Sequence, residues 1–294
     1  GDLRDIGKVD EILKWLKEKD LSYEKDSAVW FRSTKFGDDK DRVLVKSDGE
    51  PTYFCLDAAY HKNKFVERKF DFCLNIWGAD HFGDIRRVEG FVEALGYKEK
   101  FKILIHQFVR LVEDGKEVRM SKRKGVYVTV DDLLKEVGQD VYRFFMLEYA
   151  LNTHLDFDLK LAKEQSQKNP VFYAQYAYAR IHGIIAKCKM QNAKCKMTMQ
   201  NAKCLREPAE LSLIKELIKF PDLVEEIAED YQVQRLPAYA FKLAKSFHNF
   251  YEKCPILKAE DEKILAARLE LLMATKIVLK NTLDLMGVSA PERM

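Results

Sequence analysis

Cysteine pairs and long apolar runs are both missing from this 294-residue chain. Its six cysteines include no Cys-x-x-Cys pair, which argues against a disulfide framework or a zinc site and favours free thiols in a reducing compartment. No apolar run approaches the ~18 residues that a membrane-spanning helix needs, and there is no secretory leader pattern. We therefore expect a cytoplasmic protein with no bound metal and no membrane partner.

The net charge is also small. The formal charge is +3, with 33% charged and 47% hydrophobic residues, a composition typical of a globular chain of about two domains. Any preference for a polyanion must therefore come from local clusters. One is Arg-Met-Ser-Lys-Arg-Lys at residues 119–124, and another is a Lys/Cys/Met repeat over residues 186–204. Taken alone, either cluster is more often a solvated surface than a binding site.

The first half of the chain alternates between strand and helix patterns. A helical apolar spacing covers residues 1–26. Strands are expected over residues 28–31, 42–45, 72–77, 103–112 and 126–130. The runs at 72–77 and 103–112 are nearly continuous apolar stretches, which is typical of strands covered on both faces. This alternation predicts an α/β layer, followed by helices over residues 131–137 and 139–150.

The second half carries helical patterns only. Helices are expected over residues 170–185, 209–218, 222–229, 236–253 and 259–286. The last of these is apolar on two stripes, which is typical of a core helix. The predicted fold class is therefore α/β followed by all-α, with one domain over residues 1–154 and a helical domain over residues 155–294.

Two groups of polar residues in the first half suggest a ligand site. Pro51 and Thr52 start a helix on which Tyr53 and Asp57 lie one turn apart, where they could hold a cation with several donors. A core tyrosine and a surface aspartate are the equally open alternative. The sequence 78–83, Gly-Ala-Asp-His-Phe-Gly, links a strand to a helix, which is where open α/β sheets bind their ligands.

The helical half contains an aromatic stripe. Tyr173, Tyr176 and Arg180 have the spacing i, i+3 and i+7, so they lie on one helix face. Two aromatic planes and a guanidinium suit unstacked nucleic-acid bases. Without further context, such a stripe is more often core packing.

Five motifs in order along the chain resemble those of one family, the arginyl-tRNA synthetases. They lie at residues 37–43, 51–54 with Asp57, 78–83, 169–180 and 287–294. Residues 119–123, Arg-Met-Ser-Lys-Arg, resemble the K-M-S-K loop of class I synthetases, with arginine in place of the first lysine. The H-x-G-H signature of the family is absent from the chain. The resemblance therefore implies a C-terminal portion of a larger enzyme.

The resemblance also implies a function. The expected architecture is the second half of a Rossmann-type catalytic domain followed by a helical-bundle anticodon-binding domain. The expected activity is that of a monomeric arginine–tRNA ligase that joins L-arginine to tRNA(Arg) and uses ATP as its Mg²⁺ complex. The implied site residues are Lys122, Ser121 and Arg119 for catalysis, Gly78, Asp80, His81, Phe108, Val109 and Met120 for ATP, Tyr53 and Asp57 for arginine, and Tyr173, Tyr176, Arg180 and Met294 for tRNA.

Two interpretations of such a portion stay open. It is part of an active ligase, or it binds tRNA without catalysing, because the missing imidazole pair normally stabilises the transition state of adenylation. A third candidate, another class I ligase such as the cysteine enzyme, is disfavoured because the chain lacks zinc-ligand spacing.

Overall fold

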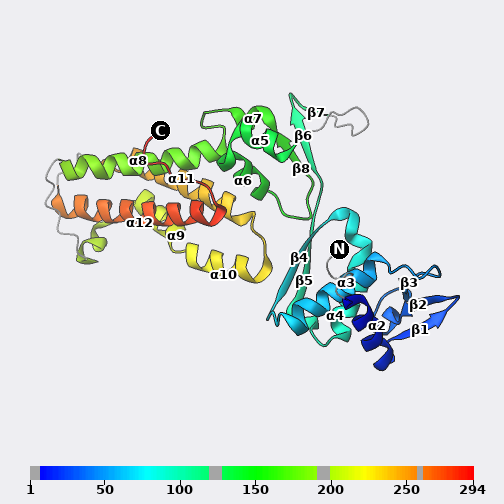
Figure 1. The fold of residues 1–294 in the computed structure, drawn as a ribbon. Coiled ribbons are helices and arrows are strands. Elements are labelled where there is room, and N and C mark those ends of the chain that lie inside the picture. Colours follow the sequence, from blue (N-terminus) through cyan, green and yellow to red (C-terminus); the bar gives the residue numbers. More distant parts are fainter. Residues whose placement is uncertain (1–6, 119–127, 191–198, 257–260) are drawn as a thin grey trace. The chain divides into compact units, whose positions relative to one another are not determined.

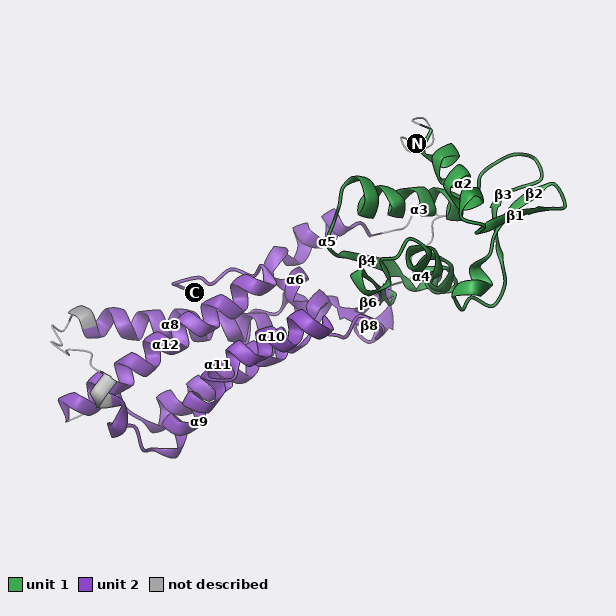
Figure 2. Ribbon diagram, turned by 90° about the horizontal axis from the view of Figure 1, so that it is seen from below, with its two compact units in different colours: residues 1–108 green, residues 109–294 purple. Residues whose placement is uncertain are grey.

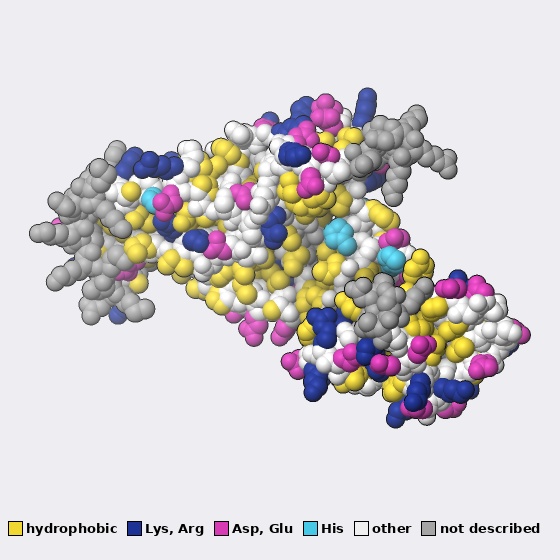
Figure 3. Space-filling view, in the orientation of Figure 1, with side chains coloured by type: hydrophobic (Ala, Val, Ile, Leu, Met, Phe, Trp, Pro, Cys, Tyr) yellow, Lys and Arg dark blue, Asp and Glu magenta, His cyan; other side chains and the backbone are white. Residues whose placement is uncertain are grey.

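The computed structural model describes residues 7–118, 128–190, 199–256 and 261–294, with side chains up to residue 188 and again from residue 202 in the region of the repeat. The chain forms two compact units, Gly1–Phe108 (unit 1) and Val109–Met294 (unit 2), which Figure 2 shows in separate colours. This division by contacts differs from the expected domain boundary at residues 154/155, which stays a prediction. On the face shown in Figure 3, acidic and basic side chains are intermixed, in keeping with the small net charge.

In its described residues, unit 1 contains two small sheets and the helices α2, α3 and α4 (Figure 1). Strands β1, β2 and β3 form an antiparallel sheet, whereas β4 and β5 pair in parallel. The elements are α2 (Lys8–Glu18), β1 (Ser22–Lys25), β2 (Ala28–Phe31), β3 (Arg42–Val45), α3 (Tyr53–Lys62), β4 (Cys73–Gly78), α4 (Ile85–Ala94) and β5 (Phe101–His106).

The core of unit 1 is built around the fully buried ring of Phe31. Its centroid lies 5.9 Å from the ring centroids of Phe54 on α3 and Phe91 on α4. Burying an aromatic side chain of this size contributes about 2 kcal/mol or more. These contacts hold α3 and α4 against the β1–β3 sheet, so the positions of Tyr53 and Asp57 on α3 are set by the core.

Three of the predicted elements in this region differ from the structure. The helix expected over residues 1–26 ends at Glu18, because Asp20 adopts a left-handed conformation (φ 53°) and the chain then enters β1. The strand expected over residues 103–112 is two strands, since β5 ends at His106 and β6 begins at Val109. Of the expected strand over residues 126–130, residues 126 and 127 lie outside the described residues and the rest is wrong, because Val128 and Thr129 are in no strand and Val130 begins a helix.

Strand β4 is covered on one face only, which corrects the expectation of a strand buried on both. Cys73 and Asn75 are buried, whereas the alternating residues Leu74 and Ile76 are exposed, Ile76 by 63%. This alternation follows from the two-residue period of a strand. In unit 1, therefore, strand β4 leaves the side chains of Leu74 and Ile76 open to solvent.

Unit 2 combines a short sheet with a helical bundle. In the sheet, β6 pairs antiparallel with β7 and parallel with β8. The elements are β6 (Val109–Glu113), β7 (Lys116–Glu117), α5 (Val130–Val137), α6 (Gln139–Leu147), β8 (Leu155–Asp158), α7 (Leu159–Lys163), α8 (Pro170–Met190), α9 (Pro208–Leu217), α10 (Phe220–Asp230), α11 (Arg235–Lys253) and α12 (Glu262–Met286).

Helices α8, α11 and α12 run side by side in Figure 1 and form the centre of the bundle. Ala174 and Ala177 on α8 and Ala240 and Ala244 on α11 are fully buried, and such small side chains let helix backbones approach closely. Within the described residues, no helix is long and apolar enough to cross a membrane, and no cluster of His, Cys, Asp and Glu could hold a metal ion.

Candidate functional site

Three predicted ATP-binding residues lie where β4 ends. Gly78 is the last residue of β4 and pairs with His106 at the end of β5, and a 3₁₀ helix over Ala79–Asp84 then leads into α4. In that turn, Nδ1 of His81 donates to a carboxylate oxygen of Asp84 at 3.1 Å. This hydrogen bond, with the neighbouring negative charge of Asp80, raises the pKa of His81. Gly78, Asp80 and His81 are therefore together at the carboxyl end of the parallel pair, where a ligand is expected.

Asp57, a predicted arginine-binding residue, lies on α3 near this turn. Thr52 caps the helix as predicted, since its Oγ1 accepts from the backbone N–H of Cys55 at 3.3 Å. Burial raises the pKa of Asp57, against the opposing positive charge of Arg87. Among the described residues, its half-buried carboxylate has no hydrogen-bond or ion-pair partner. An unpaired carboxylate that is partly out of water is suited to binding a cation.

Tyr53, the other predicted arginine-binding residue, is placed differently. It lies one turn before Asp57 at the start of α3, and it is 87% exposed. The structure thus brings Asp57 within electrostatic range of His81, whereas most of the Tyr53 side chain is exposed to solvent.

A buried polar network contacts the backbone of Asp57, and the sequence did not reveal it. Lys64 donates to Asn75 Oδ1 at 3.0 Å, the Asn75 amide donates to Nε2 of His61 at 2.9 Å, and Nδ1 of His61 donates to the backbone carbonyl of Asp57 at 2.7 Å. His61 and Asn75 are both buried. The signal in the sequence was an asparagine within the otherwise apolar strand 72–77, because a buried amide requires partners.

The remaining residues of the predicted catalytic and ATP sites are only partly described. Arg119, Met120, Ser121 and Lys122 lie outside the described residues. Upstream of them, Asp114 (φ 49°) and Gly115 (φ 74°) form a tight turn between β6 and β7. Phe108 is exposed two residues after β5 in unit 1, and Val109 is the first residue of β6 in unit 2.

The predicted RNA-binding stripe on α8 lies against helix α11. The ring of Tyr173 lies 5.0 Å from the rings of Phe241 and His248, and Tyr176 stacks on His248 at 5.9 Å between centroids. Tyr173 and Tyr176 are half-buried rather than sealed in the core. Burial, with the nearby charge of Arg180, lowers the pKa of His248 to about 4, so this imidazole is neutral at pH 7.

Arg180 extends this aromatic surface. Its guanidinium carbon lies 4.5 Å from the ring centroid of Tyr251 on α11 and 5.9 Å from that of Tyr176. These are cation–π distances. The residues from α11 were not found from the sequence, because only the packing of α11 on α8 brings Phe241, His248 and Tyr251 to the stripe.

Two cavities adjoin the α8 surface, and Met294 lines both. One of ≈ 370 Å³ is lined by Tyr176, Ala179, Arg180, Gly183, Glu292, Arg293 and Met294. The other, of ≈ 440 Å³, includes Phe172 and Gln175 on the other side of Met294. Three of the four predicted tRNA-binding residues, Tyr176, Arg180 and Met294, therefore line one cavity of unit 2, and Tyr173 contacts the same His248 ring as Tyr176.

Comparisons of this chain with family models and with curated proteins point to the same family. Residues 5–150 match the catalytic domain of class I tRNA synthetases (R), and residues 174–294 match the DALR anticodon binding domain. The chain is 46% identical to arginine–tRNA ligases of Symbiobacterium thermophilum and Moorella thermoacetica, over 99% of its own length and 52% of theirs. It thus spans about half the length of the curated relatives it matches, as their C-terminal portion.

Solved structures agree with this match. An arginyl-tRNA synthetase structure from Campylobacter jejuni superimposes with a TM-score of 0.85 at 31% identity, covering 98% of this chain and 62% of that one. The Thermus thermophilus arginyl-tRNA synthetase shares the fold, with a TM-score of 0.81 at 21% identity and coverage of 98% and 58%. With an α/β first part followed by a DALR helical domain, this chain belongs to the arginyl-tRNA synthetase family.

Proposed function

We propose that this chain is the C-terminal portion of a cytoplasmic arginine–tRNA ligase. The complete reaction converts ATP, L-arginine and tRNA(Arg) into arginyl-tRNA(Arg), AMP and diphosphate. In this proposal, residues 1–154 contribute the arginine side and part of the ATP side of the catalytic domain, and residues 155–294 bind the anticodon.

The arginine site is proposed at Asp57, with Tyr53 at its edge. The guanidinium of arginine carries five donors in a planar fork, and a carboxylate accepts two of them in parallel. The raised pKa and the unpaired state of the Asp57 carboxylate support this role. A bound guanidinium would stabilise the charged carboxylate and return its pKa to a lower value.

The ATP side is proposed at Gly78, Asp80, His81, Phe108 and Val109. Adenylation depends on positioning and on positive charge where the leaving diphosphate becomes negative. In the basic loop, Lys122 would bind the β- and γ-phosphates with Ser121, Arg119 and Met120 beside it, and Mg²⁺ would arrive with the nucleotide.

The proposed RNA site rests on one observation. Tyr173 and Tyr176 are half-buried and Arg180 is exposed, and Tyr176 and Arg180 line a cavity together with a second arginine, Arg293. Aromatic planes bind unstacked bases, and guanidinium groups bind both bases and phosphates. A stripe that served the core alone would be fully buried.

Two assays on this chain test the proposal and separate its two versions. In an RNA-binding assay, we expect the chain to bind tRNA(Arg) more tightly than a tRNA with an unrelated anticodon. In an ATP–diphosphate exchange assay with arginine, we expect little or no exchange, because the chain lacks the H-x-G-H signature. Robust exchange would show an active ligase in this half alone, and equal binding of both tRNAs would contradict the anticodon-binding role.

A further inference from the structure

The segment that follows α12, residues 287–294, is fixed to the bundle at its beginning. Gly287 ends the helix in a left-handed conformation (φ 66°), where a side chain would collide with the guanidinium of Arg143. Val288 is buried, and its N–H donates to the carbonyl of Leu283 at 2.9 Å. We call residues 287–294 the tail.

The next residue of the tail binds two helices at once. The backbone N–H of Ser289 donates to Asp140 on α6 at 3.0 Å, and its hydroxyl donates to the same carboxylate. The amide of Gln175 on α8 donates to Asp140 at 2.8 Å and to the carbonyl of Ser289 at 3.0 Å. The tail therefore leaves α12 in a direction set by α6 and α8.

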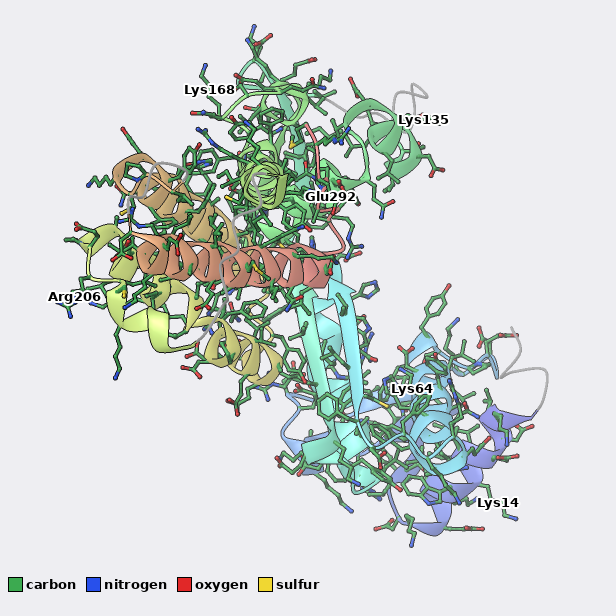
Figure 4. All side chains as sticks on the ribbon, turned by 90° about the vertical axis from the view of Figure 1, so that its left-hand side faces the viewer. Lys14, Lys64, Lys135, Lys168, Arg206 and Glu292 are labelled. Atoms are coloured by element: carbon green, nitrogen blue, oxygen red, sulfur yellow. The ribbon has the colours of Figure 1, made fainter. Side chains whose placement is uncertain are left out.

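A second anchor lies three residues further along, at Glu292, which is labelled on the tail in Figure 4. One carboxylate oxygen of Glu292 lies 3.0 Å from Nδ1 of His182 on α8 and 3.8 Å from Nζ of Lys276 on α12. Nζ of Lys276 also lies 3.1 Å from this same Nδ1 of His182, which donates to Glu292 or accepts from Lys276 according to its tautomer. Because the Glu292 side chain is 62% exposed, this cluster contributes little to the stability of the fold. Its effect is on the tail itself.

We infer that Glu292 is a positioning residue for RNA binding: by pairing with His182 and Lys276 it holds Met294 and Arg293 as one wall of the cavity beside Tyr176 and Arg180. The inference rests on the proposed function, since it takes single-stranded RNA as the ligand. When the tail is already ordered in the free protein, the free energy of RNA binding is not reduced by the entropy lost in ordering it. Because Met294 also lines the second cavity, one anchor sets the shape of both.

The test compares Glu292→Gln with a matched control in the full 294-residue chain. The control is Glu226→Gln, which removes a carboxylate of similar exposure, 64%, from an ion pair with Arg235 on another face of the bundle. The RNA probe is an unmodified stem-loop that carries the anticodon loop of a bacterial tRNA(Arg). We expect E292Q to weaken binding about two- to fivefold, the range for loss of an exposed ion pair, and E226Q to leave it at the wild-type value, with both variants unfolding at the wild-type temperature.

A second readout does not depend on RNA. With ¹³C-methyl-labelled methionine, the Met294 signal is assigned by its loss in M294L. In E292Q that signal should move toward the random-coil position, and H182A should move it in the same direction, with no further change in the double variant. In E226Q it should not move.

The possible failures are distinguishable. A wild-type chain that does not bind the stem-loop would contradict the proposed function, and the role of Glu292 with it. An E292Q chain with a displaced Met294 signal and wild-type RNA affinity would overturn this inference alone. So would an unchanged Met294 signal, which would show that the pair does not hold the tail.

Discussion

Nδ1 of His61 lies 2.7 Å from the backbone carbonyl oxygen of Asp57, one turn earlier on α3. Because a carbonyl oxygen can only accept, Nδ1 must carry the proton, and Nε2 accepts from Asn75. The structure therefore requires a neutral His61 in a single tautomer. The network connects the helix that carries Asp57 with strand β4, which ends at Gly78.

The first prediction concerns the pH dependence of unit 1. Burial lowers the pKa of His61 to about 4, below its ordinary value of 6.5. The unfolded chain thus binds a proton that the folded chain excludes, so stability is fully present above pH 6.5 and is lost as the pH falls toward 4, by about 3 kcal/mol.

The three tryptophans, Trp15, Trp30 and Trp77, all lie in unit 1. Denaturant unfolding followed by tryptophan fluorescence at pH 7 and pH 5 measures about 2 kcal/mol of this loss. In His61→Gln the difference between the two pH values should shrink, and an unchanged difference would show that another group is responsible.

The second prediction concerns arginine recognition. Asp57→Ala should raise the KM for arginine at least about tenfold in a full-length ligase that contains this chain, because the guanidinium loses a charge-assisted, two-point acceptor. Asp10→Ala, which removes an exposed carboxylate from α2, is the control. The measurement is steady-state ATP–diphosphate exchange at varied arginine concentration. An unchanged KM in Asp57→Ala would remove this residue from the site.

The third prediction concerns the turn before β3. Arg42 donates to both carboxylate oxygens of Asp38, at 2.7 and 2.6 Å, and also to Asp39 at 2.5 Å. The hydrogen bonds from Arg42 lower the pKa of Asp38 from 3.8 to about 2. The resulting stabilisation of about 2 kcal/mol is present above pH 3.8 and lost as the pH falls toward 2. At pH 7, Asp38→Asn should therefore destabilise unit 1 by about that amount in tryptophan-monitored unfolding. Asp39→Asn, whose side chain is 73% exposed, should cost less than about 1 kcal/mol, and equal costs would contradict this account.

The fourth prediction concerns a buried ion pair of unit 2. Nε of Arg268 on α12 donates to Glu210 on α9 at 2.7 Å, and the Glu210 side chain is almost fully buried. Glu210→Ala should cost about 3–5 kcal/mol, because it removes the carboxylate that pairs with a largely buried guanidinium, which then keeps only its hydrogen bond to the carbonyl of Pro255. In the double variant with Arg268→Met, much of the lost stability should be regained. Far-UV circular dichroism in denaturant follows the helical bundle, and a double variant less stable than Glu210→Ala would contradict the argument.

The elements predicted well are those specified by local sequence. Helix α11 begins at Arg235, one residue before its predicted start, and ends at Lys253 as predicted, since its apolar stripe faces a single core. The start of α3 followed from Pro51 and Thr52. In contrast, the helix predicted over residues 1–26 was too long, because apolar spacing alone does not reveal the left-handed turn at Asp20.

For the same reason, only part of each candidate site could be proposed from the sequence. Asp57 and Tyr176 came from short-range spacing and from the family resemblance. His61, Asn75 and His248 were not found, because their roles depend on contacts between elements distant in the sequence. For His248, the structure also shows a buried Nε2 without a partner among the described residues, which a sequence cannot reveal.

The most direct test of the account is the affinity of this chain for an anticodon stem-loop of tRNA(Arg), compared between Tyr176→Ala and Tyr149→Ala. Tyr149 is a partly exposed tyrosine of unit 2 outside the α8 stripe. Stacking of one base on an aromatic ring is worth about 1–3 kcal/mol. The account predicts a loss of about tenfold or more in Tyr176→Ala and wild-type affinity in Tyr149→Ala. Equal affinities of the two variants and the wild type would contradict an RNA-binding role for this surface.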